Sequence, residues 1–307
     1  MNIICTGDAL IDFKEIDTLT FKGFVGGSPL NVAVAAARLG EAVGFASQVS
    51  TDQFGQAIRT HLQDNGVSTE FLLESGAHST LAFVGEVEGE AVFDFIANRS
   101  ADVLYDPQPR QDFGAVKMVQ FGSISLLQEP AATTLTETAA KHAESATVVF
   151  DPNVRPTLIP DRDAFEARLR REWLPISHLV KVSSQDLRWL YPDTPYSEVA
   201  KMWLDHGSQA VIVTDGGDGV TLYRADHGDL QVSSFDVEVV DTVGAGDTFT
   251  GALMVSLLER GGAEGLSDEA WRGVLRAAAA AAALNCTRAG ADPPTKEELE
   301  AFLLEHS

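Results

Sequence analysis

The sequence predicts an α/β protein: a three-layer sandwich with a mainly parallel central sheet between helices, and a small antiparallel β lid. Short apolar runs of strand length alternate with stretches of helical period along most of the chain, as in repeated strand-helix units. One interruption predicts the lid, because residues 80–98 read as two alternating strands about the turn Glu88-Gly89-Glu90.

No linker or composition break divides the sequence, so we expect a single domain over residues 1–307. The lid is then formed by insertions near residues 12–25 and 80–98. An exposed strand edge in such a lid could pair across a homodimer.

The composition excludes several classes of function. With 45% hydrophobic and 22% charged residues, the 307-residue chain can bury a large core. A formal net charge of −23 repels nucleic acid and anionic membranes, and no basic run offsets it. No apolar run reaches the roughly 18 residues of a membrane span, and no signal-peptide pattern opens the chain. Cys5 and Cys286 lie in apolar contexts, which predicts free thiols in the cytoplasm.

The first strand is predicted at residues 2–7, and two carboxylates follow it. Asp8 and Asp12 come just past the strand end, where open α/β sheets bind ligands. Carboxylates accept hydrogen bonds from paired sugar hydroxyls, although turn capping explains both residues equally well.

Residues 23–40 (GFVGGSPLNVAVAAARLG) predict a bend followed by an alanine-rich helix, with Ser28 as its N-cap. Gly26 and Gly27 allow a ligand to approach the backbone closely, and Asn31 offers a donor and an acceptor from the first turn. A structural turn would explain the two glycines as well.

The middle of the chain continues the strand-helix alternation. Asn153 and Arg155 follow a predicted strand and could contact a sugar or a transferred phosphate, with a plain Asp-Pro-Asn turn as the alternative. Strands are predicted at 43–49, 116–122, 147–155, 179–183 and 210–213, a hairpin at 220–233, and helices at 52–66, 129–144, 248–260 and 271–284, with a final helix from Thr295.

Residues 239–260 (VVDTVGAGDTFTGALMVSLLER) predict a strand, a glycine turn and a helix. Gly244, Ala245 and Gly246 have little or no side chain, so their amides can converge on an anion at the helix start. Asp247 lies in the first helical turn, where a carboxylate suits proton acceptance from an attacking hydroxyl. Helix capping is the plain alternative for this residue.

Taken together, these motifs resemble those of the ribokinase-like (PfkB) carbohydrate kinases. DTVGAGDTF resembles the C-terminal signature of that family, and GGSPLNVA resembles the N-terminal signature. GDALIDF, GSISL and DPNVR are similar to fructokinase segments. The resemblance implies a ribokinase-like fold and an ATP-dependent kinase, most similar to fructokinases, that transfers the γ-phosphoryl group to a sugar hydroxyl with Mg²⁺.

The resemblance also implies a role for each matching residue. It makes Asp247 the catalytic base, with Gly244, Ala245 and Gly246 forming the anion hole. The implied sugar contacts are Asp12, Gly26, Gly27, Asn31, Asn153 and Arg155; the implied ATP contacts are Thr214, Gly216 and Gly219; and the implied metal contacts are Asp186 for Mg²⁺ and Asp241 for a monovalent cation, K⁺.

Two stretches depart from the family pattern. FDFIANRSADVLY matches the fructokinase stretch FxFYRNPSADMLL, but Ala97 stands at the family's arginine and Arg99 at its proline. Arg99 is the remaining basic candidate for sugar binding, so 2-keto-3-deoxygluconate or another sugar stays open as the acceptor. Ser183 stands where relatives carry Asn or Asp. Outside enzymes, a catalytically silent sugar or nucleotide sensor is the alternative.

Overall fold

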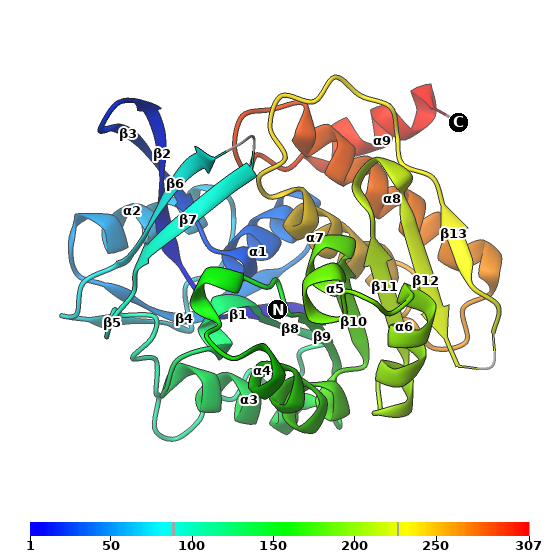
Figure 1. The fold of residues 1–307 in the computed structure, drawn as a ribbon, viewed down its shortest axis with the longest axis horizontal. Coiled ribbons are helices and arrows are strands. Elements are labelled where there is room, and N and C mark those ends of the chain that lie inside the picture. Colours follow the sequence, from blue (N-terminus) through cyan, green and yellow to red (C-terminus); the bar gives the residue numbers. More distant parts are fainter. Residues whose placement is uncertain (88–89, 226, 307) are drawn as a thin grey trace.

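The structure is a computed structural model that describes residues 1–87, 90–225 and 227–306 of the chain. A nine-stranded sheet forms the middle layer of this described part (Figure 1). Its strands are β1 Ile3–Thr6, β4 Val43–Ser50, β5 Leu72–Ser75, β8 Met118–Gly122, β9 Thr147–Asp151, β10 Leu179–Ser183, β11 Ala210–Thr214, β12 Val220–Arg224 and β13 Leu230–Val232.

The order of the strands in this sheet is β13-β12-β11-β10-β9-β8-β1-β4-β5. The strands from β11 to β5 pair in parallel, whereas β12 is antiparallel to both of its neighbours. The carboxyl ends of the parallel strands therefore lie along one edge of the sheet, which is where such sheets bind ligands.

Helices cover both faces of the sheet, as the sequence predicts. One face is covered by α1 Ser28–Arg38, α2 Gln53–Asp64, α7 Ala245–Leu258, α8 Asp268–Cys286 and α9 Lys296–Glu305. The opposite face is covered by α3 Ala131–His142, α4 Arg162–Arg168, α5 Ser184–Leu190 and α6 Tyr196–Asp205.

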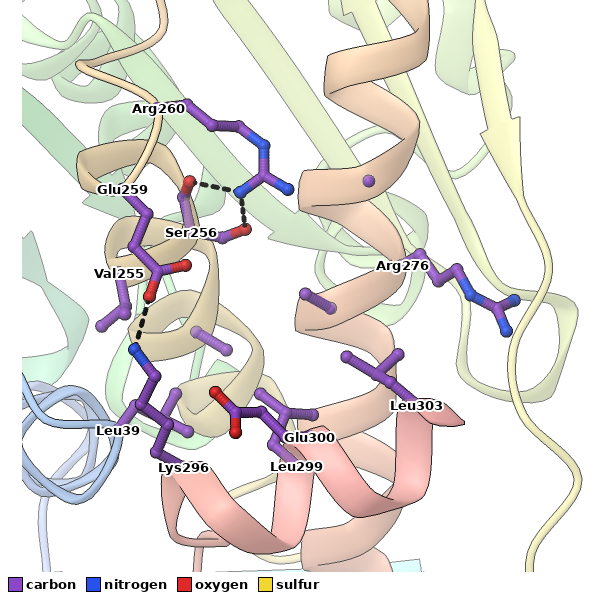
Figure 2. Close-up of a pocket in the computed structure, with 13 residues that line it drawn as sticks. Leu39, Val255, Ser256, Glu259, Arg260, Arg276, Lys296, Leu299, Glu300 and Leu303 are labelled. Atoms are coloured by element: carbon purple, nitrogen blue, oxygen red, sulfur yellow. Dashed lines mark hydrogen bonds and ion pairs between the residues drawn. The ribbon is translucent and has the colours of Figure 1, made fainter. Parts of the chain in front are cut away.

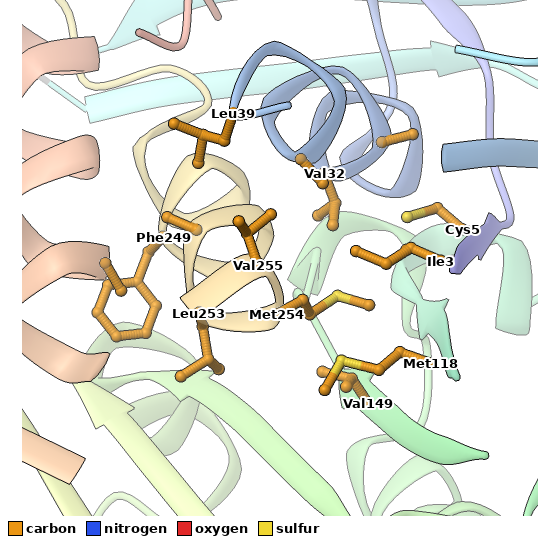
Figure 3. Close-up of a cluster of buried hydrophobic side chains, with 14 of the residues drawn as sticks. Ile3, Cys5, Val32, Leu39, Met118, Val149, Phe249, Leu253, Met254 and Val255 are labelled. Carbon is orange, nitrogen blue, oxygen red and sulfur yellow. The ribbon is translucent and has the colours of Figure 1, made fainter. Parts of the chain in front are cut away.

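Alternation along the buried strands separates two apolar layers. Ile3 of β1 packs toward α1 and α7, and Ile4 packs on the other face with Val119. Figure 3 shows the first layer, in which Met254 of α7 lies beside Met118 of β8. From Asp247 to Leu257 every residue of α7 is buried, because the helix lies between α1 and α8 as well as on the sheet. Burial on all sides fixes the N-terminus of α7 at the carboxyl edge of the sheet.

The lid is a separate four-stranded sheet. It comprises β2 Leu10–Asp17, β3 Thr20–Gly26, β6 Thr80–Val87 and β7 Glu90–Ile96, in the order β3-β2-β6-β7. Each hairpin is antiparallel, and the parallel pair of β2 and β6 joins the two hairpins. The predicted insertions near 12–25 and 80–98 therefore coincide with the strands of this second sheet. Two residues of the predicted turn, Glu88 and Gly89, lie outside the described residues.

Two local predictions are wrong. Val239 and Val240 do not form a strand, and the two residues are 59% and 62% exposed. None of the described strands pairs with them, and valine favours a strand only where it can pack on a pleated surface. Ser28 is the first residue of α1 rather than its N-cap, which is Gly27, because the Ser28 hydroxyl donates to Asp247 instead of capping the helix.

Other local predictions are confirmed. The capping box of Thr295 and Glu298 begins α9. Cys5 and Cys286 are free thiols. Among the described helices, none has the length and apolar character needed to cross a bilayer.

Candidate active site

The predicted catalytic residues form the N-terminus of α7 at the carboxyl edge of the sheet. Gly244 precedes the helix with φ 75°, and a Cβ there would lie 2.5 Å from the Cβ of Ala291. The Ala245 amide donates to the Thr242 carbonyl at 3.2 Å. The amides of Gly246 and Asp247 have no acceptor within the described part of the chain. These two amides are therefore the ones that can bind an anion.

Asp247 is a buried carboxylate held from three directions. Its Oδ1 accepts from the Ser28 hydroxyl at 2.7 Å and from the Asn153 amide at 3.5 Å. Its Oδ2 accepts from the Asn31 amide at 2.8 Å. Burial raises the pKa of Asp247, against the opposing effect of these hydrogen bonds and of the nearby Lys181 charge. A fixed carboxylate of raised basicity beside an anion hole is suited to act as a general base.

A buried ion pair lies directly beneath this turn. Lys181 on β10 donates to Asp151 on β9, with Nζ and Oδ2 3.0 Å apart and side chains 5% and 1% exposed. A Cβ on Gly246 would lie 2.8 Å from the Lys181 Nζ. Reasoning from the sequence missed both members of the pair. The available signal was a lysine inside the otherwise apolar strand LVKVS.

The predicted sugar contacts gather on the lid side of Asp247. The Asp12 carboxylate lies over Gly26, where a Cβ would overlap with it. Burial raises the pKa of Asp12 to about 6, with Arg155 opposing the shift and Asp247 adding to it. The guanidinium of Arg155 donates to the Asn153 side-chain oxygen at 2.5 Å. Asn153 contacts the Asp247 carboxylate, and Asp12 and Arg155 lie close enough to act on one another's charge.

Asp8 holds the start of α1 next to the loop after β8. Its carboxylate accepts from the Ser28 amide at 3.2 Å and from the Ser125 hydroxyl at 3.2 Å. Burial, together with the charge of Asp102, raises the pKa of Asp8 to about 7. Gly27 passes over the Asp8 carbonyl with φ 113°. Asp8 therefore holds the start of α1 through the Ser28 amide.

The predicted ATP contacts lie farther along the same edge of the sheet. Thr214 ends β11 and is in register with Ser183 at the end of β10. Gly216 and Gly219 adopt φ 50° and φ 98° in the turn that leads into β12. Strand β11, which leads into this turn, is the neighbour of β10 in the sheet, and β10 carries Lys181.

The two metal candidates have different surroundings. Asp186 lies in the first turn of α5, which Ser183 caps, and burial raises the pKa of Asp186 to about 6, with Asp151 adding to the shift. Asp241 accepts from the Lys14 ammonium and from the Gly290 amide, both at 3.1 Å. Across residues 1–87, 90–225 and 227–306, no three His, Cys, Asp or Glu side chains are grouped to hold a metal ion.

Arg99 makes no polar contact with the described residues around Asp247. It is exposed, adopts φ 56°, and forms no hydrogen bond or ion pair within the described residues. Ala97, which stands at the family's arginine position, is buried. A role of Arg99 in sugar binding stays a prediction.

The sequence profile described as pfkB family carbohydrate kinase matches residues 1–298 of the chain. The chain is 35% identical over 260 residues to a fructokinase of Rhizobium leguminosarum bv. trifolii, covering 83% of this chain and 79% of that protein. It is 34% identical over 318 residues to probable fructokinase-4 of Arabidopsis thaliana, covering 98% of this chain and 96% of that protein.

Solved structures are similar over the same length. Fructokinase from Xylella fastidiosa with bound ATP matches with TM-score 0.90 and 30% identity, covering 99% of this chain and 98% of that one. Aminoimidazole riboside kinase from Salmonella enterica, complexed with aminoimidazole riboside and an ATP analog, matches with TM-score 0.87 and 29% identity, covering 98% and 99%. A double mutant of Vibrio cholerae O395 fructokinase, bound to fructose, ADP and potassium ion, matches with TM-score 0.88 and 27% identity, covering 98% and 97%.

Proposed function

The chain belongs to the pfkB family of carbohydrate kinases, and from this premise we propose that it is a fructokinase, which transfers the γ-phosphoryl group of ATP to a primary hydroxyl of fructose. Relatives named fructokinase at 34–35% identity support this acceptor. The similarity to a fructokinase with bound ATP supports the donor.

The observation that carries the proposal is the placement of Asp247. Its carboxylate is buried and fixed by Ser28 and Asn31, next to two amides that have no acceptor among the described residues. In the proposed reaction Asp247 accepts the proton of the sugar hydroxyl, and the hydroxyl oxygen attacks the γ-phosphorus. The bond between that phosphorus and ADP breaks, while the Gly246 and Asp247 amides stabilise charge on the transferring group.

The surrounding residues supply binding and orientation. Asp12, Gly26, Gly27, Asn31, Asn153 and Arg155 would hold the sugar, and Thr214, Gly216 and Gly219 would hold ATP. Mg²⁺ bound to ATP would neutralise phosphate charge, and the Asp186 carboxylate is a hard oxygen ligand suited to that ion. Asp241 would face a monovalent cation such as K⁺, although the Lys14 ammonium already neutralises this carboxylate.

Aminoimidazole riboside is a second candidate acceptor, because the chain is similar to aminoimidazole riboside kinase. An acid sugar such as 2-keto-3-deoxygluconate is less well supported, since Arg99 makes no contact with the described residues of the cluster. A silent sensor is disfavoured, because Asp247 is buried and held beside two amides that have no acceptor among the described residues, as a base and an anion hole would require.

The test is ADP release with Mg²⁺ and ATP against fructose, aminoimidazole riboside, 2-keto-3-deoxygluconate, ribose and glucose. We expect the highest kcat/KM with fructose. A higher kcat/KM with another sugar would reassign the acceptor and leave the kinase chemistry standing. No ADP release with any of the five would contradict the proposed function.

Two properties of the whole protein belong to the same proposal. Free Cys5 and Cys286 support a reducing, cytoplasmic location. Ile16, Leu19 and Ile96 of the lid strands and turn are 63%, 83% and 52% exposed, which supports a homodimer that covers them. Chromatographic mass before and after Leu19→Lys would test the dimer.

A further inference from the structure

The ion pair of Lys181 and Asp151 has no part in the chemistry proposed above, and its burial is costly. The two side chains are 5% and 1% exposed. Moving an ion from water into a protein interior costs several kcal/mol, and an apolar pair of similar volume is often at least as stable. Stability alone is therefore a weak reason for a lysine at this position.

The place of the ammonium is informative. Its Nζ lies beneath the first turn of α7, 2.8 Å from the point where a Cβ of Gly246 would be. A helix N-terminus repels a cation through its dipole, so neighbouring anions must hold the ammonium there. Asp151 is one of these anions, through a direct hydrogen bond of 3.0 Å, and Asp247 is another, through its charge.

The helices packed beside Asp247 contribute uncharged groups. From α1 the contacts are the uncharged Ser28 and Asn31, and from α8 the uncharged Asn285 bonds to the neighbouring Thr248. The charged groups that act on Asp247 are Asp12 of β2, Asp151 of β9 and Lys181 of β10. Two further charged groups belong to the same cluster: Arg155 acts on Asp12, and Asp186 of α5 acts on Lys181.

We propose that Lys181 is a positioning residue for the phosphoryl transfer: its buried ammonium, held by Asp151, keeps the Asp247 carboxylate ionised where water cannot solvate it. This inference rests on the proposed function, in which Asp247 must be deprotonated to accept the proton of the sugar. Burial by itself favours the protonated carboxyl. A fixed cation held by Asp151 beneath the first turn of α7 opposes that effect.

The two members of the pair act on Asp247 in opposite directions. Lys181 lowers the pKa of Asp247 and Asp151 raises it. Removing the ammonium should therefore raise this pKa, and removing the Asp151 charge should lower it. An ion pair that only holds the fold together predicts the same defect from either substitution.

The test is the pH dependence of kcat at saturating ATP and sugar for wild type, Lys181→Met, Asp151→Asn and the double variant. For Lys181→Met we expect the acidic limb of the pH profile to move to a pH about one unit higher. At pH values below this limb, kcat should be about tenfold lower than that of wild type. For Asp151→Asn we expect the limb to move down. The double variant should return close to the wild-type limb and regain much of the melting temperature lost by each single variant.

Because stability also changes with pH, kcat is expressed per folded enzyme, with the folded fraction measured by circular dichroism at each pH. The carboxyl ¹³C signal of Asp247, identified by its absence in Asp247→Asn, reports the same pKa without turnover. The test therefore stands even if no sugar is phosphorylated. Limbs and ¹³C titrations that move in the same direction in both single variants, or in neither, would overturn the proposal.

Discussion

The two ends of α7 both gather charged side chains, and they differ in what surrounds those charges. At the N-terminus Asp247, Lys181 and Asp151 are buried. At the C-terminus a groove between α7, α8 and α9 holds Glu259 and Lys296, whose side chains are 46% and 47% exposed (Figure 2). Charges that water solvates are inexpensive to keep and weak in effect, whereas buried charges act strongly on one another.

The difference teaches where function can be inferred from charge. Charged groups at the groove have partners within it: Glu259 forms an ion pair with Lys296 at 2.8 Å, and Arg260 donates a hydrogen bond to the Ser256 hydroxyl at 2.8 Å. At the buried end, the Asp247 carboxylate accepts hydrogen bonds from the uncharged Ser28 and Asn31, and the ion pair of Lys181 and Asp151 is buried near it. We therefore expect substitutions at the N-terminus of α7 to lower activity, and substitutions at its C-terminus to change only stability, by a small amount.

The largest expected effect comes from Asp247→Asn. Asparagine keeps the size of the side chain and can still bond to Ser28, but it cannot accept the proton of the sugar. We expect kcat to fall by at least about 10²- to 10⁴-fold, with a melting temperature close to that of wild type. Steady-state kinetics and thermal unfolding measure the two quantities. Turnover within a few-fold of wild type would show that Asp247 is not the base.

A matched pair of glycine substitutions compares the two ends directly. In Gly246→Ala the new Cβ would lie 2.8 Å from the buried Lys181 Nζ, so the first turn or the ammonium must move. We expect a loss of kcat on the order of tenfold to a hundredfold, because small misplacements of catalytic groups are costly.

The control for that substitution is Gly273→Ala on α8. Its Cβ would lie 3.2 Å from the Arg260 guanidinium, a flexible group that can move aside. We expect unchanged kcat and a gain in the free energy of unfolding of roughly 0.5–1 kcal/mol, since alanine favours a helix interior over glycine. Equal losses of kcat in Gly246→Ala and Gly273→Ala would show that the two ends of α7 do not differ in their effect on activity.

We also expect buried carboxylates near the N-terminus of α7, such as Asp8, to cause the pH dependence of stability. Burial raises the pKa of Asp8 from 3.8 to about 7, so between these values the folded protein holds a proton that the unfolded chain releases. This residue's contribution to the free energy of unfolding therefore falls as pH rises from about 4 to 7, by up to about 1.4 kcal/mol per pH unit.

Asp8→Asn removes that contribution. Relative to the variant, wild type should lose stability as pH rises through this window, which urea unfolding at pH 5, 6 and 7 would measure. A stability difference that is constant over the three pH values would contradict the raised pKa.

The smallest effect is expected at the groove. Glu259→Gln breaks the exposed pair with Lys296 and should change the free energy of unfolding by no more than about 0.5 kcal/mol. The difference should vanish in 1 M salt, where charges are screened. Urea unfolding at low and high salt measures it. A loss of several kcal/mol would mean that this pair is coupled to the fold as tightly as the buried one.

The sequence predicted most of the fold because its signals there are local. The capping box at Thr295 begins α9, and the alternating strands at 80–87 and 90–96 form the lid hairpin. Val239 and Val240 misled because strand propensity does not reveal whether a partner strand exists. Tertiary neighbours, not local preference, decided that segment.

The candidate site was predictable where a motif carried it and hidden where the fold assembled it. Asp247 and its glycine turn could be predicted from one stretch of sequence. Ser28 has good N-cap chemistry, so its bond to Asp247 could not be inferred locally. The pairing of Lys181 with Asp151 depends on the register of two strands that are brought together by a crossover. Lys14 meets Asp241 across 227 positions of sequence.

The bond between Ser28 and Asp247 joins residues 219 positions apart. During synthesis the residues proposed to contact the sugar at Asp12, Gly26, Gly27 and Asn31 emerge well before Asp247, the proposed base. A chain that ends anywhere between β7 and α7 would therefore lack the group proposed to activate the acceptor. Such an unfinished chain would be unable to phosphorylate a sugar, and the proposed activity would begin only when both ends of the molecule have folded together.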